Sequence, residues 1–165
     1  MILAHLPSGY LLGRATGTRD RTVLIAALIG SVAPDFDMFW FHLIDQGQTH
    51  HHRFWPHIPL VMLGIAACAL LLTAIVARRW LAPVAVFFGA VMMHLLLDTV
   101  NGGIMWLWPL NDRLYSLVTV PATRSHWVLS FLTHWSTLAE LAIIAAAAMV
   151  LHRDLAARSS RHKIE

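Results

Sequence analysis

The chain has 165 residues, of which 58% are hydrophobic and only 13% are charged, and its mean hydropathy is +0.62. This composition excludes an ordinary soluble domain, in which about 25% of residues are charged, and the length allows a single domain. The formal net charge is +3, with eleven histidines against nine carboxylates. A basic chain can bind nucleic acid, but here the positions of the arginines indicate a membrane protein, so we expect no direct nucleic-acid partner.

The first predicted elements occupy residues 2–43. Residues 2–13 are apolar but too short to cross a membrane, and we expect a half-length helix that turns back through residues 13–21. The N-terminus lacks the basic start and small-residue cleavage site of a signal peptide, so we expect it to remain in the mature protein. Residues 22–43 form the first candidate membrane helix, which a proline and two aspartates interrupt.

Three later segments have the length and apolarity of membrane helices. They are residues 58–77, which carry no charge, residues 81–100, which contain His94 and Asp98, and the alanine-rich residues 135–151, which contain Glu140. We therefore predict an all-α, polytopic membrane helical bundle of about four transmembrane helices, with the short N-terminal half-helix and irregular outer loops at 44–57 and 101–133. A single membrane-embedded domain would cover residues 1–152, followed by a basic, unstructured tail over residues 153–165.

The arginines and the single lysine predict the orientation of the chain, because cytoplasmic loops are enriched in these residues. A four-span chain places nine of them on one side and three on the other. The nine are Arg14, Arg19, Arg21, Arg78, Arg79, Arg153, Arg158, Arg161 and Lys163, and the three are Arg53, Arg113 and Arg124. We expect an inner (cytoplasmic) membrane protein with both terminal regions in the cytoplasm and the two long loops outside.

Polar side chains from separate segments fall at one membrane depth. Counted at about 1.5 Å per residue, four of them lie about 20 Å from the cytoplasmic arginines. These four are His5, Asp35, His94 and Glu140, while Asp37, Asp98, His52 and His57 lie slightly further out. A carboxylate in hydrocarbon is costly and normally faces a cavity, a partner or an ion. A divalent cation would keep the carboxylates ionised and the imidazoles neutral, so the shared depth indicates a metal site.

The local spacings fit metal binding. His94 and Asp98 are four residues apart, which places both side chains on one face of a helix. Proline breaks the helix before Asp35, and an open helix within a membrane is tolerated where it lines a cavity. Residues 50–57 supply up to four imidazoles at the entrance to a span. Imidazole and carboxylate without thiolate suit zinc, manganese or iron.

Each motif also has a purely structural interpretation. The histidine and aspartate four residues apart can be a local polar pair, and the aspartates around position 36 can form a helix cap or a turn. At least one of His50 and His51 is expected to be solvated, and Glu140 can hydrogen-bond to a neighbouring helix. Only the shared depth favours a joint site over these separate interpretations.

Taken in order, the motifs resemble the YdjM-like family. They are His5 with the following small residues, the run Ser31-Val32-Ala33-Pro34-Asp35-Phe36-Asp37, His52-Arg53 followed by His57, His94-xxx-Asp98-Thr99, and residues 103–110. The likeness covers roughly residues 1–115 and extends weakly to the last span. Members of this family are described as membrane-bound proteins with inferred metal-dependent hydrolase activity and are sometimes labelled LexA-binding.

The chain departs from the family pattern in one block. The usual HR-x-x-THS has Pro56 in place of the threonine and Ile58 in place of the serine, which keeps both imidazoles but puts any hydroxyl role in doubt. A more distant similarity is to zinc-dependent phospholipases C, which also use a helix with histidine and aspartate four residues apart. Their later HxxxE motif is not matched, because Ser136 stands four residues before Glu140.

These residues predict a site that combines metal ligands with catalytic groups. One to three divalent ions, zinc first with manganese and iron as alternatives, would lower the pKa of bound water and polarise the scissile group. The predicted metal ligands are His5, Asp35, His52, His57, His94 and Asp98. Asp37 or Glu140 would accept the water proton, and Arg53 would neutralise an anionic substrate.

The expected function is hydrolysis of a phosphoester or another bond in a lipid or lipid-linked substrate at the outer membrane face. The alternatives are a divalent metal-ion or proton transporter, for which intramembrane carboxylates and histidines are equally natural, and a non-enzymatic membrane regulator. A transporter needs access from both sides of the membrane, and four spans leave little material for two gates. The LexA-binding label would belong to a regulator.

Overall fold

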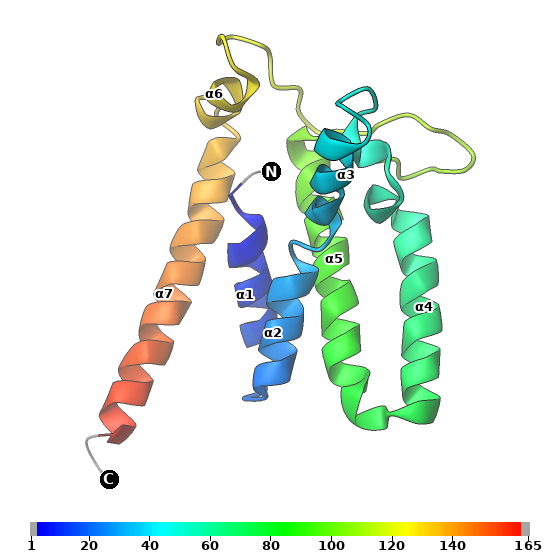
Figure 1. Cartoon of the computed structure of the whole chain (residues 1–165). Coiled ribbons are helices and arrows are strands. Elements are labelled where there is room, and N and C mark those ends of the chain that lie inside the picture. Colours follow the sequence, from blue (N-terminus) through cyan, green and yellow to red (C-terminus); the bar gives the residue numbers. More distant parts are fainter. Residues whose placement is uncertain (1–2, 163–165) are drawn as a thin grey trace.

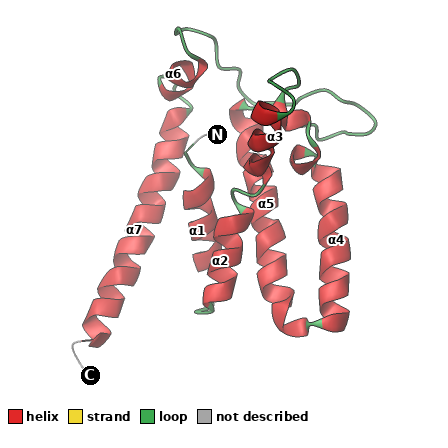
Figure 2. Cartoon of the chain, in the orientation of Figure 1, coloured by secondary structure: helices red, strands yellow, loops and turns green. Residues whose placement is uncertain are grey.

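The computed structural model describes residues 3–162 of the chain, without the side chains of residues 158, 161 and 162. Within these residues the regular secondary structure is helical and is joined by loops, as Figure 2 shows. An isolated antiparallel bridge pairs Ile104 with Tyr115. The helices are α1 (His5–Ala15), α2 (Arg21–Gly30), η1 (Pro34–Phe36), α3 (Asp37–Leu43), η2 (His51–Arg53), η3 (Trp55–His57), α4 (Pro59–Val76), η4 (Arg78–Trp80), α5 (Leu81–Asn101), α6 (Trp127–Leu132) and α7 (Thr137–His162). The predicted all-α class is confirmed.

The expected count of about four transmembrane helices is not confirmed. Two of the described segments are long and apolar enough to cross a membrane, namely α4 and the segment Arg78–Asn101, which joins η4 to α5. A third span results if α2 and the η1–α3 segment are taken together. These two segments pass the length and apolarity test only as a pair, and they are bent by 52° at a short break. α7 does not qualify, because Glu140 lies in its first turn and Arg153 and Asp154 interrupt it further on.

α5 lies at the centre of the bundle and packs against α1, α2 and α4 (Figure 1). Its side chains Val91 and Leu95 are fully buried and cluster with Met62 of α4. α2 approaches α5 closely at Gly30, where a Cβ atom would lie 2.3 Å from the carbonyl oxygen of Phe87. Small residues permit such close helix contacts in membranes, and this contact fixes the position of the α2 C-terminus beside α5.

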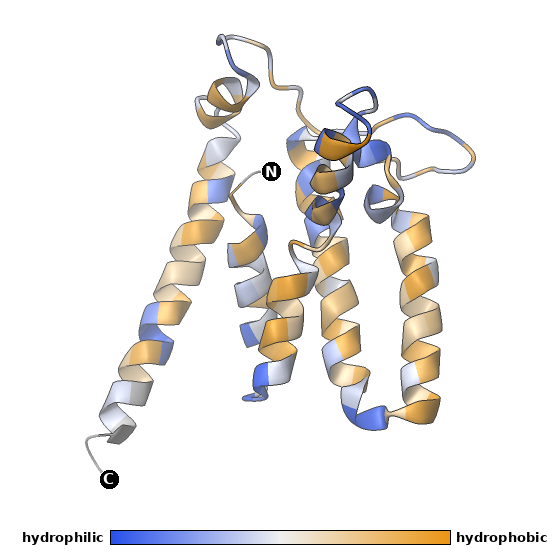
Figure 3. Cartoon of the chain, viewed as in Figure 1, coloured by the Kyte–Doolittle hydropathy of each residue, from blue (hydrophilic) through white to orange (hydrophobic). Residues whose placement is uncertain are grey.

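The outward faces of the long helices are apolar. On α4, Leu71, Leu72 and Ile75 are 65%, 63% and 74% exposed, and Figure 3 shows apolar residues along most of α4 and α5. Soluble monomers rarely expose so large a continuous apolar surface. These faces therefore suit contact with lipid chains.

The two ends of the bundle differ in charge. Figure 1 shows the α1–α2 turn, the α4–α5 turn and the C-terminal end of α7 at the same end. We call this the arginine end, because these two turns and their flanking residues carry Arg14, Arg19, Arg21, Arg78 and Arg79. We call the opposite end the loop end. It carries the start of α1, the connection from α3 to α4, the connection from α5 to α6, and α6 itself.

Two predictions about the connections and the tail are corrected. The outer connections 44–57 and 101–133 are not irregular throughout, since they contain the short helices η2, η3 and α6. Residues 153–162, expected to be an unstructured tail, continue α7 as helix. Residues 163–165 of that tail lie outside the described residues.

Candidate metal centre

The break between α2 and η1 builds the first part of the site. Proline lacks an N–H group and cannot continue a helix without strain, and Pro34 stands at the start of η1, directly before Asp35. The break leaves the carbonyl of Ser31, the C-cap of α2, free of the helix ladder. It accepts a hydrogen bond of 2.8 Å from His94 Nδ1. The interruption of the helix therefore orients a histidine of α5.

Four side chains from three elements meet around one point. Asp35 comes from η1, His57 from η3, and His94 and Asp98 from α5, and one ligand atom of each lies within 4.8 Å of the others. We call this set the four-residue centre. The side chains of the two histidines are fully buried and that of Asp98 is 3% exposed, whereas that of Asp35 is 40% exposed. The centre is thus enclosed on one side and open at Asp35.

The distances within the four-residue centre resemble the edges of a metal coordination shell. His94 Nε2 lies 3.0 Å from Asp98 Oδ2 and 3.6 Å from Asp35 Oδ1. His57 Nε2 lies 3.8 and 3.9 Å from these same two oxygens, and the two Nε2 atoms are 3.4 Å apart. Nitrogen ligands about 2.0–2.1 Å from a tetrahedral zinc ion would be about 3.3 Å apart. Small movements would bring all four ligand atoms onto one ion.

Hydrogen bonds fix the tautomers of the two rings. A carbonyl oxygen only accepts hydrogen bonds, so His94 Nδ1 carries the hydrogen that it donates to Ser31. His57 Nδ1 donates at 2.7 Å to Asp37 Oδ2. In the neutral rings each Nε2 then presents a lone pair, and the two lone pairs face each other across 3.4 Å. An ion between them removes this repulsion, and such second hydrogen bonds are typical of metal-binding histidines.

His5 lies behind the two carboxylates of the centre. Its Nδ1 is 3.7 Å from Asp35 Oδ2 and its Nε2 is 3.2 Å from Asp98 Oδ1, whereas the other oxygen of each carboxylate faces His94. Its ring also stacks on that of His94, with centroids 3.8 Å apart. His5, a predicted ligand, is therefore placed to orient the carboxylates rather than within the four-residue centre.

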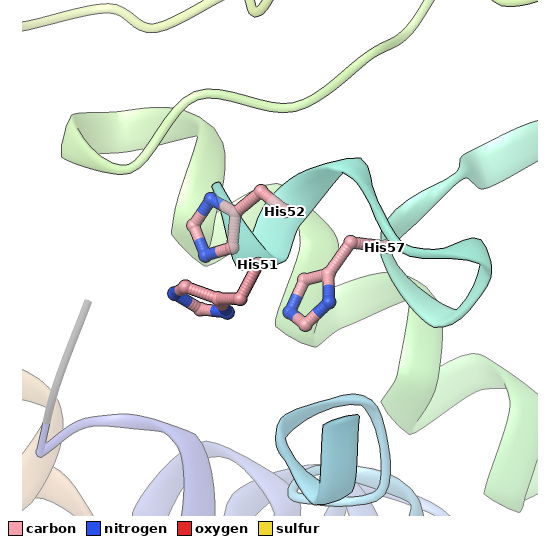
Figure 4. A group of neighbouring side chains, drawn as sticks. All are labelled: His51, His52 and His57. Carbon is pink, nitrogen blue, oxygen red and sulfur yellow. The ribbon is translucent and has the colours of Figure 1, made fainter. Parts of the chain in front are cut away.

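A second group of rings, drawn in Figure 4, consists of His51, His52 and His57 from η2 and η3. His52 Nδ1 donates at 2.8 Å to the carbonyl of Gly103, while its Nε2 lies 3.6 Å from Asp98 Oδ2. Burial lowers the pKa of His52 to about 3, so its ring is neutral near pH 7, as a metal ligand must be. His57 belongs to both groups, but with its Nδ1 already donating it has one nitrogen for an ion.

His51 is a site residue that the sequence did not single out. The sequence left open which of His50 and His51 is solvated. In the structure His50 is exposed, and its side chain caps η2 by accepting a hydrogen bond from the backbone N–H of His52. His51 is half-buried, and its Nδ1 lies 3.7 Å from Asp37 Oδ1. Within residues 3–162 neither His51 Nδ1 nor Asp37 Oδ1, both buried atoms, has a hydrogen-bond partner. Buried polar atoms are usually satisfied, so the pair marks a place for water, substrate or an ion.

A pocket of about 530 Å³ opens beside the four-residue centre. Its polar lining includes Asp35, Asp98, His51 and His52, and its apolar lining includes Met38, Phe41, Trp127 and Phe131. Ligand pockets are commonly apolar with a few convergent polar groups. This one suits a molecule with a polar group next to an apolar part.

Glu140, predicted as a catalytic base, has a different place in the structure. Its side chain is buried and accepts hydrogen bonds from the backbone N–H groups of Leu3 and, at 3.1 Å, Ala4. These residues directly precede His5. Glu140 therefore joins α7 to the start of α1 and holds the segment that carries His5.

The other two residues predicted to be catalytic also have specific partners. Asp37 accepts the hydrogen bond from His57 and lies beside His51, so it orients rings rather than facing the pocket. Arg53 lies 3.7 Å from the exposed Asp112 and does not line the pocket. Arg53 is thus directed toward Asp112 of another loop and not into this pocket.

Comparison with known proteins gives one match. No curated protein and no solved structure matches the chain. The sequence profile of a family described as YdjM inner membrane protein matches residues 1–159, which include every residue of the four-residue centre and extend beyond the motifs noted above. The chain therefore belongs to the YdjM inner membrane protein family.

Proposed function

We propose that this protein is a membrane-bound, metal-dependent hydrolase of a lipid or lipid-linked phosphoester. One observation carries the proposal: the Nε2 atoms of His57 and His94 face each other at 3.4 Å, beside two carboxylates that both line a pocket. Such a group of ionisable side chains in an apolar bundle is costly without an ion. Structural metal sites are closed, whereas catalytic sites keep an open position, and the exposed side of Asp35 supports a catalytic one.

Zinc is the proposed ion for this donor set, with manganese and iron as alternatives. When bound, it would lower the pKa of a water molecule to about 7 and polarise the scissile group. The protein's part is to hold the donor atoms in place. Ser31 orients His94 and Asp37 orients His57, because each oxygen accepts the hydrogen bond that the ring donates from Nδ1. His5 lies against the carboxylate oxygens of Asp35 and Asp98 that face away from His94.

His51 is the proposed proton acceptor, in place of Asp37 and Glu140. It lines the pocket, and the carboxylate of Asp37 lies behind it at 3.7 Å. Histidine is the most frequent general base in enzymes, and a carboxylate commonly orients it. In this arrangement Asp37 serves two rings, His57 through one oxygen and His51 through the other.

The walls of the pocket support a lipid or lipid-linked substrate. The aromatic side chains of Phe41, Trp127 and Phe131 line it together with Met38, so an acyl or isoprenoid chain could lie there while the phosphoester approaches Asp35. The pocket belongs to the loop end, opposite the arginines. Since arginine-rich ends are normally cytoplasmic, the proposed site faces outward from the inner membrane.

Metal analysis and hydrolysis assays on the same purified protein test this function. We expect the wild type to contain a stoichiometric divalent metal and to hydrolyse a phospholipid or bis-p-nitrophenyl phosphate, and His94→Ala and Asp98→Ala to lose both properties. His152→Ala is the matched control, because His152 is exposed on α7 and does not line the pocket. Unchanged metal content in both variants would refute the site. Metal uptake into proteoliposomes that depends on Asp35, without hydrolysis, would assign transport instead.

A further inference from the structure

A second cavity lies at the arginine end, away from the metal centre. It has a volume of about 500 Å³ and is lined by residues of α1, the α1–α2 turn, α2 and α7. Its charged lining consists of Arg14, Arg19, Arg21, Asp20 and Asp154. Nothing in the proposed hydrolysis uses this cavity, so its charge needs a separate explanation.

Both carboxylates of the cavity already have partners in the protein. Asp154 Oδ2 lies 2.5 Å from an Nη atom of Arg14 and accepts the hydroxyl of Tyr10. Asp20 caps α2 by accepting from the backbone N–H and the hydroxyl of Thr22, both at 2.8 Å. These contacts occupy the negative groups and one of the three arginines.

Arg19 and Arg21 remain as the available cations of the cavity. Both side chains are exposed, and neither makes a hydrogen bond or an ion pair with another described residue. A guanidinium presents several donors in a planar fork that matches phosphate oxygens. Two such groups at the mouth of one cavity fit a phosphate group.

The surface that continues from the cavity is apolar. Leu24 and Ala157 complete the lining, and Ile25 and Ile29 follow Arg21 at intervals of four residues on α2, where they are 52% and 50% exposed. Residues at this spacing lie on one face of a helix. Figures 1 and 3 show α2 rising from the arginine end with apolar residues above its charged start. A ligand with a phosphate headgroup and acyl chains would match both parts.

We infer that this cavity binds the phosphate headgroup of an anionic phospholipid from the leaflet at the arginine end. Basic pockets between membrane helices are known binding places for such headgroups. Arg19 and Arg21 bind the phosphate, Arg14 is held beside them by Asp154, and the acyl chains lie along the exposed isoleucines of α2. The bound lipid links α2 to α7, since both helices contribute residues to the lining of the cavity.

The test uses the full chain purified in detergent, with phosphatidylglycerol as the probe. Binding is followed by the thermal shift on lipid titration and by native mass spectrometry of retained lipid. Each arginine near an anionic lipid contributes about fivefold in affinity, so Arg19→Gln/Arg21→Gln should weaken phosphatidylglycerol binding by about 25-fold. Arg78→Gln/Arg79→Gln removes the same charge at the same end but outside the cavity, and it should leave binding near the wild-type value.

Further measurements distinguish a lipid ligand from a soluble anion and test the cavity with a variant of unchanged charge. Ala157→Phe fills the cavity without changing its charge and should also weaken binding. Phosphatidylcholine and inorganic phosphate should give no comparable shift in the wild type; an equal shift with inorganic phosphate would show a soluble anion site and overturn the lipid assignment. Equal losses in the Arg19/Arg21 and Arg78/Arg79 variants would show general surface attraction and would also overturn it. Unchanged binding in Ala157→Phe would exclude the cavity.

Discussion

His57 Nε2 and His94 Nε2 lie 3.4 Å apart, and each ring donates its other nitrogen's hydrogen to a fixed oxygen. The two residues come from a loop turn and from the central helix. Their lone pairs converge only because a helix break, a carboxylate and a glycine contact between α2 and α5 position the rings.

Removing the carboxylate behind His57 should weaken metal binding without removing a ligand of the four-residue centre. Loss of an outer-shell partner typically costs 10- to 100-fold in metal affinity, so we expect Asp37→Ala to raise the Kd for zinc by about this factor. Isothermal titration or competition with a chromogenic chelator measures it. Asp112→Ala is the control, because Asp112 is 83% exposed and contacts Arg53 only at the periphery. An unchanged Kd in Asp37→Ala would show that the hydrogen bond to His57 has no role in binding.

Substitutions of His51 and His94 should have different effects on turnover and on metal content. We expect His51→Ala to retain its metal and to lose about 10²–10⁴-fold in kcat, the usual contribution of a general base. His94→Ala should lose the metal itself. Metal content and kcat measured on the same preparations distinguish the two effects. If His51→Ala loses the metal in parallel with activity, His51 is a ligand rather than the proton acceptor.

Glu140 should matter for stability rather than for chemistry. Its carboxylate accepts two backbone N–H groups before His5, and leaving a buried donor unsatisfied costs about 1–3 kcal/mol. We expect Glu140→Ala to lower the thermal midpoint, whereas Glu140→Gln keeps an acceptor oxygen and should retain metal and most of the activity. A metal-loaded Glu140→Gln protein without turnover would make Glu140 the base after all.

The close approach of α2 to α5 should be intolerant of a single methyl group. A Cβ atom at Gly30 would lie 2.3 Å from the carbonyl oxygen of Phe87, and overpacking of this kind costs about 1–3 kcal/mol. Because Ser31 follows directly, Gly30→Ala should also weaken metal binding through the hydrogen bond to His94. Gly64 of α4 has nothing within 4 Å of its Cβ position, so Gly64→Ala should be neutral or stabilising. Equal thermal midpoints for the two variants would contradict the close packing.

The sequence predicts the helical class well, because this class follows from hydropathy and from the length of the apolar segments. Asp35 and His94 were expected at one depth, with His57 and Asp98 slightly further out, and the structure brings the four side chains together. The number of spans expected from hydropathy is not confirmed. The segment through Pro34 bends by 52°, and α7 carries Glu140, Arg153 and Asp154 along its length.

The roles within the site depend on side-chain directions that spacing does not encode. Glu140 has the depth of a ligand, but it points to the backbone before α1. The sequence selected His52 as a ligand but left the choice between His50 and His51 open, and the short turn η2 exposes His50 while it turns His51 and His52 inward. Arg53 lies next to His52 in sequence, yet the same turn directs it to Asp112.

The most direct test of the central claim is an anomalous difference map from crystals of the metal-loaded full chain, collected at the absorption edge of the bound metal. We predict one strong peak about 2.0–2.2 Å from the Nε2 atoms of His57 and His94 and from oxygens of Asp35 and Asp98. A map of active protein with no peak between the two rings, or with the metal bound elsewhere, would contradict the account.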